Sequence, residues 1–377
     1  IRDRAMQALH LMALDPISEA GADPNSYGFR KHRATHDALE QTFKLLSTKR
    51  SATWVLDADI KGCFDHISHD WIMQNIPMDK SILRQWLKCG FIEVEKGKTL
   101  FPTAAGTPQG GIASPCLCNM VLDGLEKVVK AATPKGRQIN FVRYADDFVV
   151  TARHRSDLEQ YLLPAIADFL KDRGLALSEQ KTNIRHIRKG FDFLGCNIRN
   201  YSDGKLRITP STKNVKTFLA KVRATIRQCR GNNLGLVIER LNPMIRGWSN
   251  YHRHGSPLDR YGYVDYQVYK AVWRFLKRSH PNKSSKWIYS KYIKPDPENR
   301  GRLAFCTQIE KVVRKDGSTI LKTIYLQAAA NTKRIWHLKV RGQANPYLPE
   351  DQKYFRWRRG LKKLIKEGKW KPSWNAG

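Results

Sequence analysis

The stretch "FVRYADDFVV", residues 141–150, places two adjacent carboxylates, Asp146 and Asp147, between two apolar runs. Two short apolar runs around a polar dipeptide are typical of a β-hairpin with the polar residues at its turn. Aspartate is common in turns, so the pair could serve only as a polar hairpin tip. Alternatively, it holds a positively charged ligand. The chain carries a net charge of +33, which favours a specific reason for placing two negative charges side by side.

A second acidic segment, "VLDADIKGCFD" (residues 55–65), reads as an apolar strand that ends in carboxylates. Side chains alternate along a strand, so Asp57 and Asp59 would share one face. Mg²⁺ prefers oxygen ligands and is usually bound by one or two carboxylates together with substrate phosphates. Two such ions can clamp the attacking and leaving oxygens of a phosphoryl transfer. A hairpin turn beside this strand end would supply the necessary carboxylates.

The positive charge is concentrated in the second half of the chain. Residues 1–200 hold 28 Lys and Arg against 23 Asp and Glu, whereas residues 201–377 hold 39 against 11. Such a field attracts a polyanion. Seven of the ten tryptophans lie beyond residue 240, and aromatic rings among basic residues suit unpaired RNA, whose bases stack on them. A solvated basic surface is the alternative, but an excess this large favours a nucleic-acid partner.

The bulk composition bounds the remaining possibilities. With 377 residues, 41% of them hydrophobic, the chain can form two or three domains with substantial cores. No apolar run approaches the roughly 20 residues that cross a bilayer, so we expect no membrane partner. Seven cysteines without a CxxC pair predict reduced thiols, a cytoplasmic location and no zinc. Because the sequence begins at Ile rather than Met, we expect a fragment that lacks its true start.

The order of predicted elements indicates an α+β fold. The first fifty residues read as helix, loop and helix. Residues 52–200 then read as a strand, a helix, a turn and helix, the hairpin, a helix and a strand at 190–200, which places helices behind a mainly antiparallel sheet. In the segment that reads as a turn and a helix, we expect Ser114 to cap the helix and Pro115 to occupy its first position. The buried face of this helix would consist of Leu117, Val121, Leu125 and Val128.

After about residue 205 the pattern becomes helical and basic. Residues 209–231, 241–255 and 264–280 predict three helices, the second restarting at Pro243, which would form a small bundle with basic outer faces. Residues 300–377 are less regular, with a possible hairpin at "RKDGST" (314–319) and a basic stretch at 354–374.

Taken together, these motifs resemble a known family. "YADD" (144–147), the strand "VLDADIKGCFD" and "GTPQGG" (106–111) are similar to the palm of reverse transcriptases. Further segments resemble the group II intron-encoded reverse transcriptase/maturase family: "DRAMQALHLMALDPISEA" (3–20), "SYGFRKHR" (26–33), "LALSEQKTNI" (175–184), "FDFLG" (191–195) and "LNPMIRGWSNYHRHG" (241–255). The resemblance implies a right-hand polymerase fold, with fingers and palm at 1–204, a thumb or maturase helical bundle at 205–299 and a basic DNA-binding region at 300–377.

The resemblance also implies roles for individual residues of the polymerase site. Asp59, Asp146 and Asp147 match the catalytic carboxylates; Asp59 and Asp146 would bind two Mg²⁺ ions with the Ile60 carbonyl. The other matches are Phe64 as the gate that excludes a 2′-hydroxyl, Gln109 against the deoxynucleotide (dNTP), Arg30 and Arg33 on its triphosphate, Lys181 as a general acid, and Phe193, Leu194 and Gly195 at the primer end.

For the basic bundle, the resemblance implies binding and splicing of the group II intron RNA. Lys and Arg on phosphates would supply salt-dependent affinity, and aromatic residues would contact unpaired bases. The expected RNA contacts are Lys213, Lys216, Arg223, Arg227, Arg246, Trp248, Tyr251 and Arg253. His252 and His254 have no further ligand nearby in sequence, so we expect RNA contact or simple exposure rather than a metal site.

The implied function is an RNA-directed DNA polymerase and maturase that splices its intron and copies it during retrohoming into DNA. The expected partners are the intron RNA, the primer–template duplex and the target DNA, while the oligomeric state stays open. Lys31 replaces the family's usual proline after "GFR", and the single cysteine beyond residue 229 predicts no zinc-bearing nuclease. Alternatives are a catalytically silent RNA-binding splicing factor and a reverse transcriptase of another bacterial lineage; Phe64 and Ala145 disfavour an RNA-templated RNA polymerase.

Overall fold

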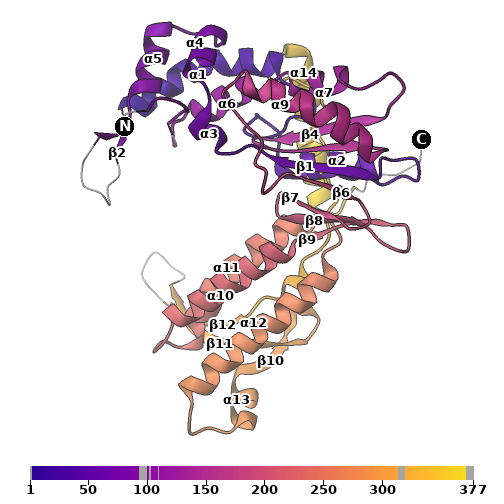
Figure 1. Cartoon of the computed structure of the whole chain (residues 1–377). Coiled ribbons are helices and arrows are strands. Elements are labelled where there is room, and N and C mark those ends of the chain that lie inside the picture. The colour runs from indigo at the N-terminus through magenta and orange to yellow at the C-terminus, as the bar shows by residue number, and fades with distance from the viewer. Residues whose placement is uncertain (1, 93–99, 102, 109, 313–318, 371–377) are drawn as a thin grey trace. The chain divides into compact units, whose positions relative to one another are not determined.

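The computed structural model describes residues 2–92, 100–101, 103–108, 110–312 and 319–370 (Figure 1). The chain forms two compact units. The first comprises Ile1–Leu194, Ile198–Leu206 and Trp336–Gly377, and the second comprises Gly195–Asn197 and Arg207–Ile335. The structure therefore divides the chain differently from the three predicted segments, because residues 300–335 belong to the second unit and residues from 336 onward to the first.

The first unit is built on a four-stranded antiparallel sheet with the strand order β4-β5-β1-β6 (Figure 1). Its strands are β1 (Trp54–Asp59), β4 (Ile139–Tyr144), β5 (Asp147–Ala152) and β6 (Asn183–His186). The hairpin predicted around residues 145–146 is confirmed, as is the strand that ends at Asp59. β1 lies in the middle of the sheet, between β5 and β6, so its acidic end adjoins the hairpin turn.

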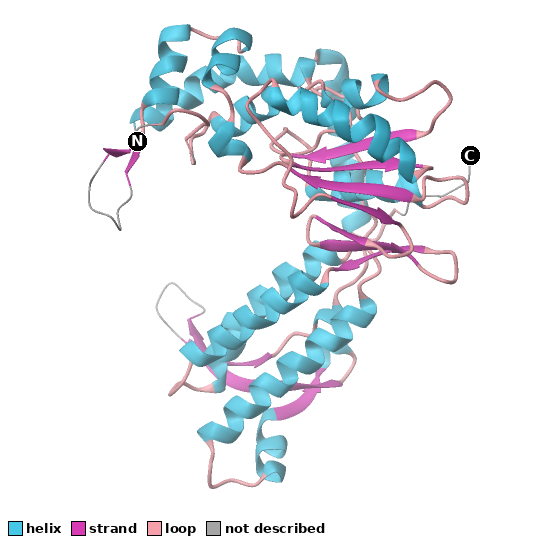
Figure 2. Ribbon diagram, in the orientation of Figure 1, coloured by secondary structure: helices cyan, strands magenta, loops and turns pink. Residues whose placement is uncertain are grey.

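Helices supply most of the remaining core of the first unit (Figure 2). Leu117 and Val121 on α6 and Ile166 on α9 pack in one cluster with Phe148 and Val150 of the sheet. The helices of this unit are α1 (Arg2–Gly21), α2 (Thr35–Leu46), α3 (Cys63–His66), α4 (His69–Asn75), α5 (Lys80–Lys88), α6 (Ser114–Leu122), α7 (Leu125–Ala131), α8 (Arg155–Asp157), the π-helical Leu158–Leu162, α9 (Leu163–Lys171) and α14 (Pro349–Lys366). Two short strands, β2 (Phe91–Ile92) and β3 (Leu100–Phe101), pair separately.

The single helix predicted after Ser114 is instead two helices. α6 ends at Leu122 and α7 begins at Leu125, because Gly124 has φ +93° in the left-handed region that glycine adopts readily. Ser114 is also not the cap: Ala113 precedes the helix, and the Ser114 hydroxyl donates to the carbonyl of Pro108. The break leaves Asp123 between the two helices, so that its carboxylate can contact side chains of other elements.

The strand predicted at residues 190–200 is instead a hairpin. β7 (Phe191–Phe193) and β8 (Cys196–Asn200) are joined by Leu194 and Gly195, whose φ angles are +49° and +74°. Two consecutive positive φ angles define the two-residue turn that best matches the twist of paired strands. β9 (Leu206–Pro210) completes a three-stranded sheet in the order β7-β8-β9.

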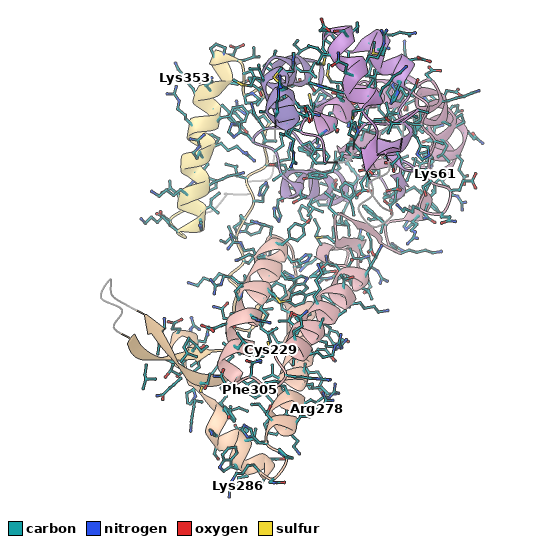
Figure 3. All side chains as sticks on the ribbon, turned by 90° about the vertical axis from the view of Figure 1, so that its left-hand side faces the viewer. Lys61, Cys229, Arg278, Lys286, Phe305 and Lys353 are labelled. Carbon is teal, nitrogen blue, oxygen red and sulfur yellow. The ribbon has the colours of Figure 1, made fainter. Side chains whose placement is uncertain are left out.

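The second unit contains the three predicted helices, which are confirmed as α10 (Thr212–Gln228), α11 (Leu234–His252) and α12 (Leu258–Ser279). The predicted restart at Pro243 is wrong, since α11 continues through this proline. A fourth helix, α13 (Ser285–Tyr292), leads into a three-stranded antiparallel sheet of β10 (Ile293–Asp296), β11 (Arg302–Val312) and β12 (Thr319–Tyr325). Cys229, after α10, and Phe305, on β11, are buried in this unit's core (Figure 3).

The basic stretch near the C-terminus forms α14, a helix that the sequence did not predict. Phe355 and Ile365 are buried, while Lys353 on the same helix is exposed (Figure 3). The buried Arg358 guanidinium lies 2.6 Å from a carboxylate oxygen of Asp37 on α2, so α14 is anchored to the first unit by an internal ion pair. Within the described residues, no helix combines the length and the apolar character needed to cross a membrane.

Candidate active site and nucleic-acid surface

The sheet brings the predicted carboxylates to one end. In the antiparallel pairing of β1 with β5, Asp59 lies directly opposite Asp147. Asp146 precedes β5 in the tight turn after β4, where Ala145 has φ +57°. Lys181 lies at the same end, with its Nζ 2.7 Å from Oδ2 of Asp59. The register therefore places Asp59, Asp146, Asp147 and Lys181 together, as the sequence predicted.

Backbone pairing continues past the end of β1 and fixes the segment that carries Lys181. The amide of Lys61 donates to the carbonyl of Ala176 (2.9 Å), and the amide of Ser178 donates to the carbonyl of Asp59 (2.8 Å). Ile60, between them, has a buried side chain and forms an antiparallel bridge with Leu177. The lysine consequently reaches the carboxylates from a segment that is hydrogen-bonded to β1.

The site holds more negative charge than its single lysine balances. Burial, followed by repulsion from Asp146 and Asp59, raises the pKa of Asp147 to about 7. Burial also raises the pKa of Asp146, and burial together with repulsion from Asp147 raises the pKa of Asp57 to about 7. The hydrogen bond to Asp59 raises the pKa of Lys181, so this ammonium stays protonated at neutral pH.

This donor set fits a divalent cation. Carboxylate oxygens are the ligands that Mg²⁺ prefers, and the raised pKa of Asp147 reports crowded negative charge that a bound cation would relieve. The Asp59 side chain is 16% exposed and the Lys181 side chain 67%, so the site is reachable from solvent. The residues that could hold an ion are Asp59, Asp146 and Asp147.

A buried arginine supports the carboxylate turn from behind. Arg143, on β4, is fully buried, and its Nη2 lies 2.5 Å from Oδ1 of Asp123. Its Nη1 donates to Oδ1 of Asn119 (3.2 Å) and to the carbonyl of Ala145 in the turn itself (3.4 Å). The sequence analysis assigned no role to Arg143, although a charged residue inside an otherwise apolar strand was a usable signal.

A second support comes from the segment before α2. The amide of Tyr27 donates to the carbonyl of Arg143, and Asn119 donates to the carbonyl of Gly28 (2.9 Å for both bonds). A Cβ atom at Gly28 would lie 2.3 Å from the backbone nitrogen of Ala145, so only glycine permits this approach. The turn that carries Asp146 is thus held from two sides.

The predicted nucleotide gate, Phe64, follows Asp59 by five positions and packs against an exposed aromatic ring. Phe64, after β1, is half-buried and contacts Phe29 edge-to-face, with ring centroids 6.3 Å apart. The Gly-rich loop is anchored beside it, because the amide of Thr107 donates to the carbonyl of Phe64 (2.7 Å). Gln109 lies outside the described residues, so its predicted nucleotide contact stays a prediction.

Arg30 and Arg33 are committed to internal partners. The Arg30 guanidinium donates to both carboxylate oxygens of Glu19 on α1, each at 2.7 Å, and to the carbonyls of Asp23 and Ser26. The Arg33 side chain is 1% exposed and donates to the carbonyls of Pro24 and Gly342. In this structure the two arginines fix the loop between α1 and α2, and neither presents a free guanidinium to a triphosphate.

Lys31, which stands where the family usually has proline, is tied to neighbouring segments. Its ammonium lies 3.2 Å from a carboxylate oxygen of Asp15 and donates to the hydroxyl of Tyr347. These contacts restrict the backbone of the loop, as a proline at this position would also do. At the other predicted contact site, Phe193 is buried and the turn residues Leu194 and Gly195 connect β7 to β8.

The residues predicted to bind RNA fall into two groups. Those on the solvent side are exposed: Lys213, Lys216, Arg223, Arg227 and Arg246. Trp248 instead stacks on Phe218 at a centroid distance of 4.8 Å and donates to Oδ1 of Asn214 (2.7 Å). The half-buried Arg253 donates to Oδ1 of Asn250, and the half-buried Tyr251 contacts His252 edge-to-face.

The expectation that His252 contacts RNA or is simply exposed is wrong. His252 is 3% exposed, and its Nε2 lies 3.1 Å from Oδ1 of Asn214, the same oxygen that Trp248 contacts. His254 is half-buried, with Nδ1 2.7 Å from the carbonyl of Ile335. These two histidines help to hold the second unit together.

Comparisons with known proteins agree with this geometry. Residues 1–198 match the family described as reverse transcriptase (RNA-dependent DNA polymerase), and residues 215–293 match the group II intron, maturase-specific domain. The chain therefore belongs to the reverse transcriptase family. It carries a maturase-specific domain as well, which makes it a member of the group II intron-encoded reverse transcriptase/maturase group.

Individual relatives give the same result. The chain is 29% identical to protein YkfC of Escherichia coli over 61% of its own length and 70% of that protein. It is 23% identical to the group II intron-encoded protein LtrA of Lactococcus lactis over 76% of its length and 62% of LtrA. It is 28% identical to maturase-like protein 1 of Euglena gracilis over 68% of its length and 53% of that protein. The chain thus spans between 53% and 70% of the length of these relatives.

Among solved structures, apo telomerase from Candida tropicalis is similar at 12% identity and a TM-score of 0.40, covering 77% of this chain and 60% of that one.

Proposed function

We propose that the protein is an RNA-directed DNA polymerase and group II intron maturase that binds its intron RNA, assists splicing and reverse-transcribes the intron during retrohoming. The observation that carries the proposal is the register of the central sheet, which sets Asp59 opposite Asp147 and beside Asp146. A purely structural sheet gains nothing from three crowded carboxylates. The chain's membership of the reverse transcriptase family supports the same conclusion.

In the proposed reaction, a dNTP joins the 3′ end of a primer paired with an RNA template. Mg²⁺ ions bound by Asp59, Asp146 and the Ile60 carbonyl would neutralise charge on the phosphates. Lys181, which lies beside Asp59, would protonate the pyrophosphate as it leaves. Phe64 would exclude ribonucleotides, because an aromatic ring cannot hydrogen-bond a 2′-hydroxyl. Gln109 would contact the nucleotide, and Phe193, Leu194 and Gly195 the primer end.

The two arginines predicted to contact the triphosphate are hydrogen-bonded within the protein instead. Arg30 would have to exchange its bidentate contact with Glu19 for the substrate, and Arg33 would have to leave two carbonyls. Replacing internal hydrogen bonds of buried guanidiniums is costly. We therefore assign to Arg30 and Arg33 the fixation of the loop that carries Phe29, which contacts Phe64.

The second unit would bind the intron RNA. Its maturase-matching segment, residues 215–293, holds 16 Lys and Arg against three Asp and Glu. The exposed basic residues of α10 and α11 would contact phosphates, whereas Trp248 and Arg253 are mainly structural in this arrangement. Residues 300–377, including exposed lysines and arginines of α14, would contact target DNA. All seven cysteines are free, which supports a cytoplasmic setting.

The decisive experiment compares cDNA synthesis and intron splicing in one preparation. We expect Asp146→Asn to lower primer extension on an RNA template by about 10³-fold or more, because metal-assisted stabilisation contributes several kcal/mol to the barrier. Splicing of the intron RNA should be retained. The matched control is Asp172→Asn, an exposed aspartate after α9, which should leave both activities unchanged.

The alternative is a catalytically silent splicing factor with a polymerase fold. Absence of Mg²⁺-dependent cDNA synthesis by the wild-type protein, in a preparation that splices, would establish that alternative. Loss of splicing together with cDNA synthesis in Asp146→Asn would contradict the separation of the two functions between the two units.

A further inference from the structure

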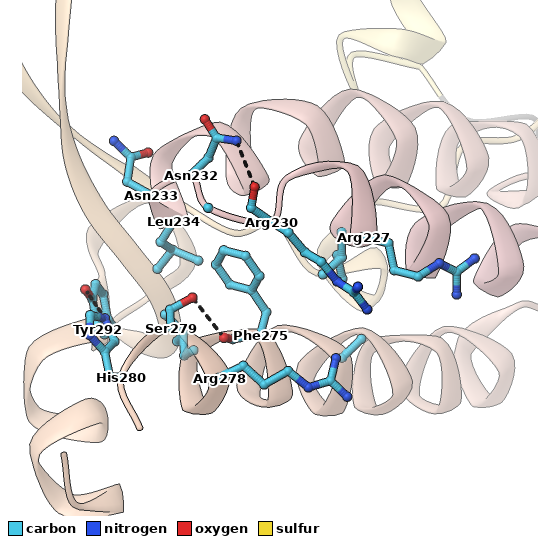
Figure 4. A pocket seen from close by; sticks show the side chains of 14 residues that line it. Arg227, Arg230, Asn232, Asn233, Leu234, Phe275, Arg278, Ser279, His280 and Tyr292 are labelled. Atoms are coloured by element: carbon cyan, nitrogen blue, oxygen red, sulfur yellow. Dashed lines mark hydrogen bonds between the residues drawn. The ribbon is translucent and has the colours of Figure 1, made fainter. Parts of the chain in front are cut away.

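The second unit contains a hollow of about 550 Å³ beside the ends of α10 and α12 (Figure 4). This volume lies within the roughly 300–1,000 Å³ that small-ligand sites occupy. Its lining comes from the end of α10, the loop to α11, the last turns of α12 and the end of α13. The hollow is therefore confined to one unit and built by four consecutive helical segments.

Arginines dominate one side of this hollow. Arg227, Arg230 and Arg278 line it, and a smaller adjoining hollow of about 250 Å³ shares these three and adds Arg223 and Arg274. Neither lining contains an aspartate or glutamate. Five guanidiniums from α10, the loop after it and α12 therefore surround these two adjoining hollows.

These guanidiniums lack internal partners. Among the residues that the structure describes, no side-chain hydrogen bond or ion pair is made by Arg227, Arg230, Arg274 or Arg278; Arg223 reaches only Oε1 of Gln267, at 3.5 Å. In Figure 4, Arg230 and Arg278 extend to the same side of Phe275. Like charges gathered around a concave surface repel one another and attract an anion, whose binding removes that repulsion.

The opposite side of the hollow is apolar and aromatic. Leu234 and Phe275 contribute apolar surface beside it. At the far end, the rings of His280 and Tyr292 stack with centroids 5.5 Å apart and share a hydrogen bond of 2.8 Å. At the rim, the exposed Asn232 donates from Nδ2 to the carbonyl of Arg230 (3.4 Å), and its Oδ1 adds an acceptor. One side suits phosphate, and the other suits a flat ring with polar edges.

We propose that this hollow binds a single unpaired nucleotide of RNA, with the flanking phosphates on the arginines and the base against the apolar side. The proposal rests on the RNA binding assigned above to the second unit and specifies its substrate as an unpaired residue. A concave site of this size accommodates one nucleotide, whereas a base pair stacked in a duplex cannot enter it. Unpaired, splayed-out bases are also the usual targets of sequence-specific RNA recognition. The Asn232 side chain would hydrogen-bond the ribose 2′-hydroxyl, which RNA has and DNA lacks.

The test compares two triple variants that each remove three positive charges from exposed positions of the second unit. The pocket variant is Arg227→Gln/Arg230→Gln/Arg278→Gln. The control is Lys221→Gln/Arg240→Gln/Lys277→Gln, whose exposed residues lie on α10, α11 and α12 but outside both linings. Thermal melting followed by circular dichroism verifies that both variants fold. The probes are a fluorescent RNA hairpin with a one-nucleotide bulge, the same hairpin without the bulge, and the bulged hairpin in DNA.

We expect the wild-type protein to bind the bulged RNA about tenfold more tightly than the uninterrupted RNA, in line with the stacking of one base. The pocket variant should lose this preference, and its dependence of log K on log salt should weaken by about 2, since two to three phosphate contacts are lost. The control should lose affinity for both RNAs equally and keep the preference.

Three results would overturn the proposal. They are an absent bulge preference in the wild-type protein, an equal loss of that preference in both triple variants, and an equal preference for the DNA bulge. In each of these three results, the wild-type protein would still bind RNA. Failure of the wild-type protein to bind either RNA would instead overturn the proposed function of the second unit, so the two failures are distinguishable.

Discussion

Charged residues are used in opposite ways by the two units. In the first, Arg143 is fully buried and its guanidinium is bound by Asp123, Asn119 and the turn carbonyl of Ala145. In the second, Arg278 is exposed and has no side-chain partner among the described residues. Buried pairs hold a shape, whereas exposed cations without partners are available to a ligand.

The same contrast distinguishes the two kinds of site. The polymerase site gathers negative charge on a framework whose own charges are paired internally, including the Arg30–Glu19 and Arg358–Asp37 contacts. The hollow of the second unit gathers positive charge that only a partner can neutralise. Substitutions in the first unit should therefore act through stability and geometry, and those in the hollow through affinity.

The largest effect on stability should come from Arg143→Met. Removing one partner of a buried ion pair leaves the other charge uncompensated and costs about 3–5 kcal/mol. We expect a correspondingly lower urea midpoint for the first unit, and any folded protein should lose cDNA synthesis because the Ala145 carbonyl loses its support. Hydrogen exchange of the β4 and β5 amides localises the loss.

Asp123→Asn is the companion of that variant. Since burial already raises the pKa of Asp123 to about 6, neutralising this carboxyl should cost less than removing the arginine. Equal and negligible effects of both substitutions would show that the buried pair does not hold the turn.

Local patterns in the sequence were sufficient to predict the hairpin, the strand that ends at Asp59 and the three helices of the second unit. Each depends on an alternation or helical spacing within about twenty residues, which is readable without the fold. The break at Gly124 was missed because it serves a contact between Asp123 and Arg143, twenty positions apart. α14 was missed because its buried face is completed by Asp37, 321 positions away.

The candidate site shows the same limit. Family resemblance predicted which carboxylates belong together, and the register brings Asp59 and Asp147 opposite each other. The resemblance gave no indication that Arg30 forms an ion pair with Glu19, because a contact between α1 and the following loop depends on tertiary packing. Arginine spacing on α10 and α12 likewise does not reveal a hollow until the helices pack.

The next prediction concerns Gly28→Ala, which alters the support of the turn between β4 and β5. The added methyl group would lie 2.3 Å from the backbone nitrogen of Ala145, so the turn must shift, at a cost of about 1–3 kcal/mol. We expect cDNA synthesis to fall more than RNA binding. Gly21→Ala is the matched control, because nothing lies within 4 Å of the Cβ atom added there. Equal activity of the two variants would contradict the close approach of residue 28 to the turn.

The pH dependence of stability provides a smaller effect. Asp147 has a pKa of about 7 in the folded protein against 3.8 ordinarily, so the folded state holds its proton more tightly than the unfolded state. Stability should therefore fall as pH rises from about 4 to about 7, and Asp147→Asn should stabilise the metal-free protein at pH 8 by roughly 1 kcal/mol or more.

The measurement for Asp147 is the unfolding midpoint at pH 5 and pH 8, with and without MgCl₂. Added Mg²⁺ should stabilise the wild-type protein at pH 8, because an ion that binds only the folded state stabilises it, and should stabilise Asp147→Asn less, because that variant already lacks one of the crowded charges. The exposed Asp172→Asn variant is the control. A wild-type midpoint independent of both pH and Mg²⁺ would remove the evidence for crowded carboxylates.

The smallest effect should come from an exposed ion pair of the first unit. Arg155 and Glu159 lie 2.8 Å apart, the same kind of contact as Arg143 with Asp123, but their side chains are 57% and 44% exposed. Solvent and salt screen such a pair, so Glu159→Gln should change the free energy of unfolding by no more than about 0.5 kcal/mol. Urea unfolding beside Arg143→Met at equal ionic strength measures the difference. A loss for Glu159→Gln comparable to that for Arg143→Met would mean that burial does not separate structural from available charge in this protein, and the contrast between the two units would lose its physical basis.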